Sequence, residues 1–147
     1  MTIHARLVRE PIEATALLQR VAGPANGALL LFLGVVRDVN DGRAVTGIEY
    51  SAYEAMAARE LADIAMEATK RFPQLDVAIE HRLGELALED ASVGIAVAHP
   101  HRGDAYDASR WVIEELKRRV PIWKREHYAD GTREWVNPVG AAAAVTQ

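Results

Sequence analysis

The chain has 147 residues, half of them hydrophobic and about a quarter charged, which is the composition of an ordinary globular protein. Its formal net charge of −4 argues against a general nucleic-acid-binding protein, which would be basic. No apolar run approaches the roughly 20 residues of a membrane span, and the N-terminal segment lacks the apolar core of a secretory signal. We therefore expect a soluble cytoplasmic protein with a single domain over residues 1–136, followed by an Ala-rich, loosely held tail over residues 137–147.

Cysteine is absent from the sequence. Its absence excludes disulfides, zinc–thiolate sites, iron–sulfur clusters and cysteine nucleophiles. If this protein performs sulfur chemistry, the sulfur must arrive on another molecule.

The first third of the chain predicts three strands and one short helix. Residues 3–8 alternate weakly and predict a strand, and Pro11 suits the first turn of a helix that ends near Val21. Residues 28–36 (ALLLFLGVV) are short and rich in branched aliphatics, which is typical of a strand buried on both faces. Residues 38–43 (DVNDGR) predict a polar loop, and residues 46–53 predict another strand.

The rest of the chain predicts two long helices separated by two strands. An apolar stripe predicts a helix from Glu54 to Phe72, which Pro73 ends, and residues 75–83 then alternate as in a strand. Residues 92–100 predict a buried strand, followed by a helix from about Asp104 to Arg119. Asp130-Gly131 lies between two strand-like runs and predicts a C-terminal hairpin.

Helices and strands are therefore mixed without strict alternation. This order indicates an α+β fold with a mixed, mainly antiparallel sheet.

A local basic cluster stands out in this acidic chain. Six basic and three acidic residues lie between Arg110 and Glu126. Lys117 is near the end of the second long helix and Lys124 lies just beyond the bend at Pro121, so the two ammonium groups can converge on one pocket. Two neighbouring lysines repel, which lowers the pKa of at least one of them, and with an anion between them they form a phosphate clamp. The alternative is that basic residues in a last helical turn only complement the helix dipole.

Two further segments carry anion-binding groups at the ends of strands. The segment AHPHR contains His99, His101 and Arg102 at a junction between a strand and a helix, where backbone N–H groups favour anions. The two histidines are alternatively metal ligands, although no HExxH-like motif supports this. Arg37 follows Gly34 at the end of the apolar strand 28–36, where the alternative is a solvated edge residue.

His81 is different, because it lies on the apolar face of its predicted strand, and we interpret it as a core histidine. Together, Arg37, His101, Arg102, Lys117 and Lys124 predict a shared pocket for a phosphorylated or otherwise anionic substrate. The residues alone lead no further.

Four sequence blocks give the chain a family resemblance. The segment VRDVNDGRAVTGIEYSAYEAM resembles the pattern V-R-x-x-N-x-G-x-x-V-x-x-L-x-Y-x-x-Y of the large, catalytic subunit of molybdopterin synthase (MoaE-like), with Ile48 at the Leu position. HRLGEL, His101-Arg102 and LKRRVPIWKRE resemble further blocks of that family, in the same order, and together the blocks cover roughly residues 27–136. The last block is the most specific, because it contains a lysine pair seven residues apart around Pro-x-Trp.

The resemblance implies an enzyme with an α/β hammerhead-like fold. We expect no cofactor and no metal site. The same resemblance implies a homodimer within a heterotetramer, whose small ubiquitin-like partner carries sulfur as a thiocarboxylate on its C-terminal Gly-Gly. Cyclic pyranopterin monophosphate would receive two sulfurs and become molybdopterin.

The resemblance also implies roles for individual residues. Lys117 would be the essential catalytic lysine, with Lys124 beside it. The residues that would bind the substrate together with these lysines are Val35, Val36, Arg37, His101, Arg102, Arg125 and Glu126.

Two other functions stay open at this point. One is a different phosphate-handling enzyme that shares the anion pocket but not the sulfur donor. The other is a non-catalytic module whose basic C-terminal helix binds an anion or an acidic partner, and which predicts steep salt dependence of binding.

Overall fold

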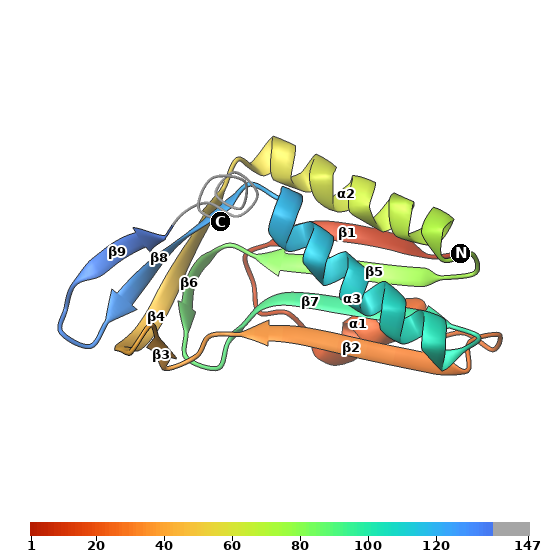
Figure 1. Ribbon diagram of the computed structural model, residues 1–147, viewed down its shortest axis with the longest axis horizontal. Helices are drawn as coiled ribbons and strands as arrows, with labels where there is room; N and C mark the ends of the chain where they lie inside the picture. Colours follow the sequence, from red (N-terminus) through yellow and green to blue (C-terminus); the bar gives the residue numbers. More distant parts are fainter. Residues whose placement is uncertain (137–147) are drawn as a thin grey trace.

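Two β-sheets and three helices make up residues 1–136, which are the residues that the computed structural model describes (Figure 1). The tail that we expect over residues 137–147 lies outside this range. Within residues 1–136, none of the helices is both long and apolar enough to cross a membrane.

The first sheet has four strands in the order β1-β5-β7-β2. The inner strands β5 (Asp76–Arg82) and β7 (Ala91–His99) are antiparallel to each other. The outer strands are β1 (Ile3–Val8), which is parallel to β5, and β2 (Ala28–Val35), which is antiparallel to β7. The sheet is therefore mixed and mainly antiparallel.

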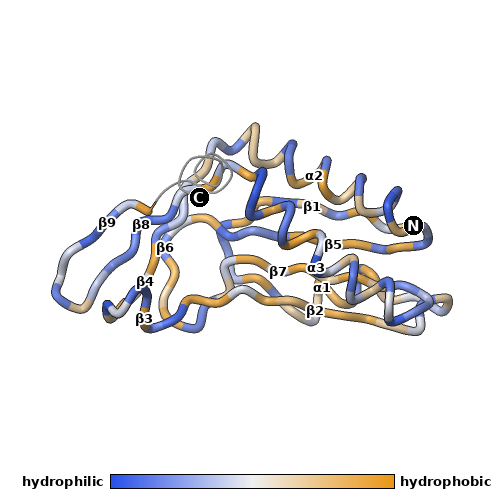
Figure 2. Tube along the Cα trace, viewed as in Figure 1, coloured by the Kyte–Doolittle hydropathy of each residue, from blue (hydrophilic) through white to orange (hydrophobic). Residues whose placement is uncertain are grey.

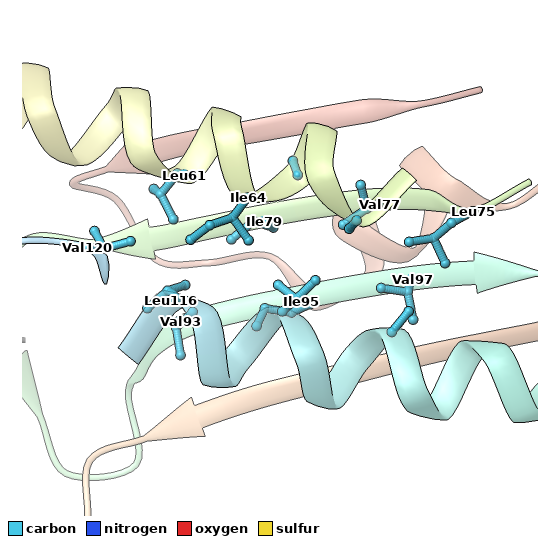
Figure 3. Packing of buried hydrophobic residues seen from close by; sticks show 14 of the residues in the cluster. Leu61, Ile64, Leu75, Val77, Ile79, Val93, Ile95, Val97, Leu116 and Val120 are labelled. Atoms are coloured by element: carbon cyan, nitrogen blue, oxygen red, sulfur yellow. The ribbon is translucent and has the colours of Figure 1, made fainter. Parts of the chain in front are cut away.

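Helices cover both faces of this sheet. The long helices α2 (Glu54–Arg71) and α3 (Arg102–Arg119) pack side by side on one face, and the short helix α1 (Ala14–Val21) packs on the other (Figure 1). Aliphatic side chains of α2, α3, β5 and β7 interdigitate in the main core, as Figure 3 shows for Leu61, Leu116 and Ile79 among others. This core fixes the C-terminal end of α3 against the sheet.

The second sheet is antiparallel and lies beside the first. It contains β3 (Val39–Asn40), β4 (Arg43–Ala52), β8 (Ile122–Tyr128) and β9 (Arg133–Val136) in that order, and β6 (Gly84–Ala87) also pairs with β4. The chain crosses between the sheets several times, at the ends of β2, β5, β6 and α3. The α+β class and the C-terminal hairpin are confirmed, although the predicted single sheet is divided into two.

The helix boundaries follow the sequence signals closely. α2 ends where predicted, with the backbone N–H of Phe72 donating to the carbonyl of Ala68 just before Pro73. α1 begins at Ala14 rather than at Pro11, and α3 begins at Arg102, two residues earlier than expected.

The prediction that residues 28–36 form a strand buried on both faces is wrong for this chain. β2 is an edge strand, and four of its large apolar side chains are between 37% and 50% exposed: Leu29, Phe32, Leu33 and Val35. Figure 2 shows hydrophobic residues along β2 as well as along the inner strands. An uncovered apolar edge of this kind is the usual mark of an interface.

The polar loop predicted over residues 38–43 is instead a tight hairpin. Asn40 pairs with Arg43 across a two-residue turn, in which Asp41 has φ 51° and Gly42 has φ 77°. Asp-Gly favours this turn because both positions need positive φ. The hairpin turns Asn40 toward the second sheet, where it becomes part of the site described next.

Candidate active site

A cavity of about 190 Å³ lies where the two sheets meet. β2 leaves the first sheet there, after a register shift between Gly34 and Val35, and the chain crosses to β3 in the second sheet. The end of α3 and the inner faces of β4 and β8 close the other sides. The cavity is therefore built by segments that are far apart in the sequence.

Four charged side chains line this cavity, three of them cationic. Arg37 follows β2, Lys117 projects from the last turn of α3, and Lys124 and Glu126 come from β8. Among the described residues, no carboxylate oxygen lies within 4.0 Å of either lysine ammonium. The bend at Pro121 thus brings Lys117 and Lys124 together, and the cavity offers positive charge to an anion.

The choice of lysine at these two positions is informative. The chain has only three lysines, Lys70, Lys117 and Lys124, against fourteen arginines. Lysine, unlike arginine, changes its pKa readily when its surroundings change. Although Lys117 is open to solvent through the cavity, the protein atoms packed around its ammonium lower its pKa, and the positive charge of Lys124 lowers it further.

Two hydroxyl groups, those of Tyr50 and Ser92, also line the cavity. Ser92 Oγ donates to the carbonyl oxygen of Gly34 at 3.3 Å. Burial raises the pKa of Tyr50, so that its hydroxyl keeps its proton. The apolar part of the lining comes from Phe32, Val35, Val39, Ile48 and Val93.

Glu126 is the only carboxylate among the described residues that line the cavity. The residue is 2% exposed, and two donors hold its Oε1 atom: Asn40 Nδ2 at 2.8 Å and the hydroxyl of Tyr128 at 2.9 Å. A buried carboxylate needs such partners because desolvation of the charge is costly. The second oxygen, Oε2, accepts no hydrogen bond from the described residues.

His81 lies in the core behind the cavity, as its place in the alternation of β5 predicts. It is 5% exposed, its ring packs edge-on against Tyr50 with 5.2 Å between centroids, and its Nδ1 bonds the carbonyl of Arg82. Burial lowers the pKa of His81 to about 4, and the nearby charge of Lys117 lowers it too. A neutral imidazole therefore packs near Lys117 without pairing with it.

Val35, Val36 and Arg125 were also predicted to bind the substrate, and only Val35 lines the cavity. Val36 is 4% exposed and packs in a small cluster with Val45 and Ile48. Arg125 does not line the cavity, because successive side chains of a strand point to opposite faces and its neighbours Lys124 and Glu126 point inward. Its guanidinium instead pairs with Glu49 at 2.5 Å and lies over the ring of Trp135.

The prediction that His101 and Arg102 share this pocket is wrong within one chain. They begin α3, while Lys117 is near its other end, and an 18-residue helix is about 27 Å long. Together with Gly27 and Gly103 they line a separate surface pocket at the far end of β2.

The alternative reading of His99 and His101 as metal ligands finds no support in the geometry. His99 Nε2 donates to the carbonyl of Pro73, and its Nδ1 accepts the backbone N–H of His101. Both ring nitrogens of His99 are therefore engaged in holding the turn before α3. Among the described residues, a group of side chains that could bind a metal ion lies in the second sheet: Glu49, Glu85 and His127. Glu49 already forms an ion pair with Arg125.

Sequence reasoning missed three polar residues of the cavity: Asn40, Tyr50 and Ser92. Two of them occupy fixed positions of the family pattern V-R-x-x-N…L-x-Y, so a signal for Asn40 and Tyr50 was present. Ser92 has no comparable signal, since it belongs to none of the family blocks and a single serine in an apolar strand does not indicate a site.

Comparison with known proteins agrees with this geometry. The family model described as "MoaE protein" matches residues 7–119. The "Molybdopterin synthase catalytic subunit" of Halalkalibacterium halodurans is 43% identical over 130 residues, which are 88% of this chain and 83% of the relative.

Solved structures share the fold. The crystal structure of molybdopterin synthase from Staphylococcus aureus superposes with a TM-score of 0.86 at 38% identity, covering 90% of this chain and 96% of that one. A chain of the complex of subunits 1 and 2 of molybdopterin-converting factor from Helicobacter pylori has the same fold, with a TM-score of 0.73 at 20% identity, covering 90% and 89%. The chain belongs to the MoaE protein family, the family of the molybdopterin synthase catalytic subunits.

Proposed function

We propose that this chain is the catalytic subunit of a molybdopterin synthase and acts as a sulfurtransferase. It transfers two sulfurs to cyclic pyranopterin monophosphate, which becomes molybdopterin. The observation that carries this proposal is the convergence of Lys117 and Lys124 on one cavity, with the pKa of Lys117 lowered by its surroundings. Since the chain contains no cysteine, the sulfur comes from a partner.

The partner that fits is a small ubiquitin-like subunit with a C-terminal Gly-Gly thiocarboxylate. A glycine tail is the thinnest that a chain can offer, which suits a cavity of about 190 Å³ that must also admit the reacting part of the substrate. The H. pylori structure with this fold is a complex of two different subunits, which supports a two-component enzyme. In each round the thiocarboxylate sulfur bonds to a side-chain carbon of the substrate, and a C–O bond of that carbon breaks, so that its oxygen leaves as water or as the freed phosphate oxygen. Water then cleaves the acyl C–S bond of the resulting thioester, which leaves the sulfur on the substrate and releases the partner as a carboxylate.

The two lysines have complementary roles in this scheme. An oxyanion develops at the acyl carbon of the partner when water attacks it, and the ammonium of Lys117 stabilises that charge in a partly dehydrated site. Lys124 and Arg37 hold the substrate phosphate, which keeps the reacting atoms in place.

His101 and Arg102 reach such a site only from a second copy of the chain. β2 is an open apolar edge, and its register with β7 places Ala28 beside His99 and Val35 beside Ala91. If β2 pairs antiparallel with β2 of a second copy, the Ala28 end of one copy lies beside the Val35 end of the other. The partner copy's phosphate-binding pair, His101 and Arg102, then lies toward the lysine cavity, and the homodimer has two complete sites.

The alternative function, a non-catalytic module whose basic helix binds an anion or an acidic partner, is disfavoured by the ion pairs of that helix. Arg110 and Arg118 pair with glutamates of their own helix, and Arg119 pairs with Glu60, Glu67 and Glu115. These three arginines are neutralised within the chain, so that the C-terminal half of the helix, the part on which this alternative depends, presents little free positive charge outside the cavity.

Reconstitution tests the proposed function. The purified chain is mixed with the thiocarboxylated small subunit and cyclic pyranopterin monophosphate, and dithiolene formation is followed by mass spectrometry. We expect two sulfurs per product, and no product when the small subunit ends in an ordinary carboxylate. A chain that binds the small subunit but forms no dithiolene contradicts the proposal.

A further inference from the structure

The buried ring of His99 joins two turns that meet at one end of the first sheet. His99 is the last residue of β7 and is 2% exposed. Its Nε2 lies 3.0 Å from the carbonyl oxygen of Pro73, just beyond α2, and its Nδ1 accepts the backbone N–H of His101 at 3.0 Å. The ring therefore connects the turn after α2 to the turn from which α3 begins.

These two contacts define the protonation state of the imidazole. A carbonyl oxygen only accepts a hydrogen bond and a backbone N–H only donates one, so Nε2 carries the proton and Nδ1 is the acceptor. The carboxylate of Asp104 lies 3.4 Å from Nε2 and favours the proton on that nitrogen. His99 is thus a neutral imidazole with no ring nitrogen left for a substrate.

The backbone of the turn between β7 and α3 is held at several points. The N–H of His101 is bonded to His99, and the carbonyl oxygen of His101 accepts the N–H of Ala105 in α3. The residue before β2 comes so close that a Cβ atom on Gly27 would lie 2.8 Å from the carbonyl oxygen of Pro100. The turn is therefore packed against the start of β2 as well as bonded to His99.

The side chains of His101 and Arg102 depend on this turn for their direction. Both residues are exposed, and the side chain of His101 makes no capping hydrogen bond to α3. An exposed side chain starts from the position and direction that its backbone gives it. The hydrogen bond from His101 to the buried ring of His99 therefore sets where the pair points.

We propose that His99 is a positioning residue for the substrate phosphate. By holding the N–H of His101, it sets the direction in which His101 and Arg102 face the lysine cavity of the second copy. This inference rests on the proposed function and goes beyond it, since His99 itself is buried and touches no substrate. Several donors bind one phosphate well only when all of them point at it before it arrives.

Asparagine and glutamine each keep a different contact of the His99 ring. In His99→Asn the amide oxygen takes the place of Nδ1 and accepts the N–H of His101, but the side chain is too short to reach Pro73. In His99→Gln the amide nitrogen takes the place of Nε2 and donates to Pro73, but no acceptor remains for His101. Each variant is uncharged and leaves one backbone group without its partner, so we expect similar losses of thermal stability.

Steady-state reconstitution measures KM and kcat for cyclic pyranopterin monophosphate in both variants. We expect His99→Gln to raise KM at least about fivefold with kcat within about twofold of wild type, because a phosphate contact contributes equally to binding of the substrate and of the transition state. His99→Asn should keep KM within about twofold of wild type. A role in folding alone predicts the same KM for both variants, so a KM for His99→Gln no higher than that for His99→Asn overturns the proposal.

His4→Gln is the matched control for replacing a mostly buried histidine by glutamine. His4 lies in β1, at the edge of the first sheet opposite β2, and its Nε2 lies 2.9 Å from Glu80 Oε2. It lines neither the lysine cavity nor the pocket of His101 and Arg102. This variant should therefore have the wild-type KM and kcat.

The hydrogen bond between His101 and His99 is tested without any substitution. Amide hydrogen exchange followed by NMR should show the N–H of His101 to be protected in the wild-type protein. The same N–H should be protected in His99→Asn and exposed to exchange in His99→Gln. Rapid exchange of this N–H in the wild-type protein contradicts the proposal, whether or not the variants fold.

A titration with inorganic phosphate distinguishes this inference from the proposed function. The NMR signals of the His101 ring protons report binding, and we expect His99→Gln to bind phosphate at least about fivefold more weakly than His99→Asn. If the wild-type protein forms dithiolene while the two variants share one KM and one phosphate affinity, the function stands and the inference fails. If the wild-type protein forms no dithiolene while the variants differ in phosphate affinity as expected, the function fails and the positioning role stands.

Discussion

Lys117 and Lys124 face one cavity from two elements, and neither has a carboxylate within 4.0 Å among the residues that the structure describes. Both desolvation and mutual repulsion favour the neutral form of Lys117, which lowers its pKa. An anionic substrate reverses the balance, because its charge favours the ammonium form. We therefore expect the protonation of Lys117 to respond to an anion that enters the cavity.

Replacing Lys124 should move the pKa of Lys117 in a defined direction. In Lys124→Met the repulsion is gone, so the pKa of Lys117 rises, but it remains below the ordinary value of 10.5 because desolvation is the larger cause. The pKa is measured by NMR titration of ¹³Cε-labelled lysine, with exposed Lys70 as the internal reference. If Lys117 donates as an ammonium, the alkaline limb of the activity profile moves to higher pH in this variant. A fall in the pKa of Lys117 in Lys124→Met would contradict the account.

At the residue scale, the sequence predicted which residue types form the site better than it predicted which way their side chains point. The bend at Pro121 was enough to predict that Lys117 and Lys124 meet, and the alternation of β5 placed His81 in the core. The same alternation in β8 points Arg125 away from the cavity, where it pairs with Glu49. The family motif was read only as matching residue types, so it did not show which side chains face the cavity. The polar residues 38–43 predict a loop, whereas Asp41-Gly42 closes a hairpin that places Asn40 in β3.

At the element scale, Arg119 joins the two long helices next to the end of α3 that carries Lys117. Its guanidinium binds Glu60 and Glu67 of α2 and Glu115 of α3, and its side chain is 18% exposed. This contact, together with the core around Leu116 and Val120, holds the turn from which Lys117 projects.

Arg119→Met should therefore destabilise the protein more than the loss of an ordinary surface pair. We expect a decrease of about 1 to 2 kcal/mol in the free energy of unfolding, because three carboxylates lose a half-buried partner. Arg110→Met is the matched control on the same helix. Within residues 1–136 Arg110 pairs only with Glu114, both side chains are mostly exposed, and its loss should cost less than about 0.5 kcal/mol. Urea denaturation measures both values, and equal losses would refute the argument.

The elements themselves were largely predictable, because long apolar stripes and the prolines at 73 and 121 mark their positions and ends. The division into two sheets was not predictable in the same way. It depends on which strands pair, and pairing between β4, β6 and β8 joins residues that are far apart in the chain. The aliphatic run of β2 predicted burial, and the structure places it at a sheet edge where Leu29, Phe32, Leu33 and Val35 are exposed.

At the scale of the whole molecule, His101 and Lys117 belong to different ends of α3. If a second copy supplies His101 and Arg102, two inactive variants should complement each other. We expect a mixture of His101→Ala and Lys117→Ala, after subunit exchange, to regain about a quarter of the wild-type rate, because half of the dimers are mixed and each mixed dimer has one intact site of two. Each variant alone, treated identically, is the control. If the mixture is no more active than its components, the two residues do not act in one site across the dimer.

The most direct test of the central claim is single-turnover reconstitution with Lys117→Met beside Arg118→Met. The two residues are neighbours in the last turn of α3, but Lys117 lines the cavity whereas Arg118 pairs with Glu115 on the surface. With thiocarboxylated small subunit and cyclic pyranopterin monophosphate, sulfur incorporated into the pterin is measured by mass spectrometry. We predict that Arg118→Met transfers sulfur at the wild-type rate and that Lys117→Met is slower by at least about 100-fold. Sulfur transfer by Lys117→Met at the wild-type rate would contradict the account.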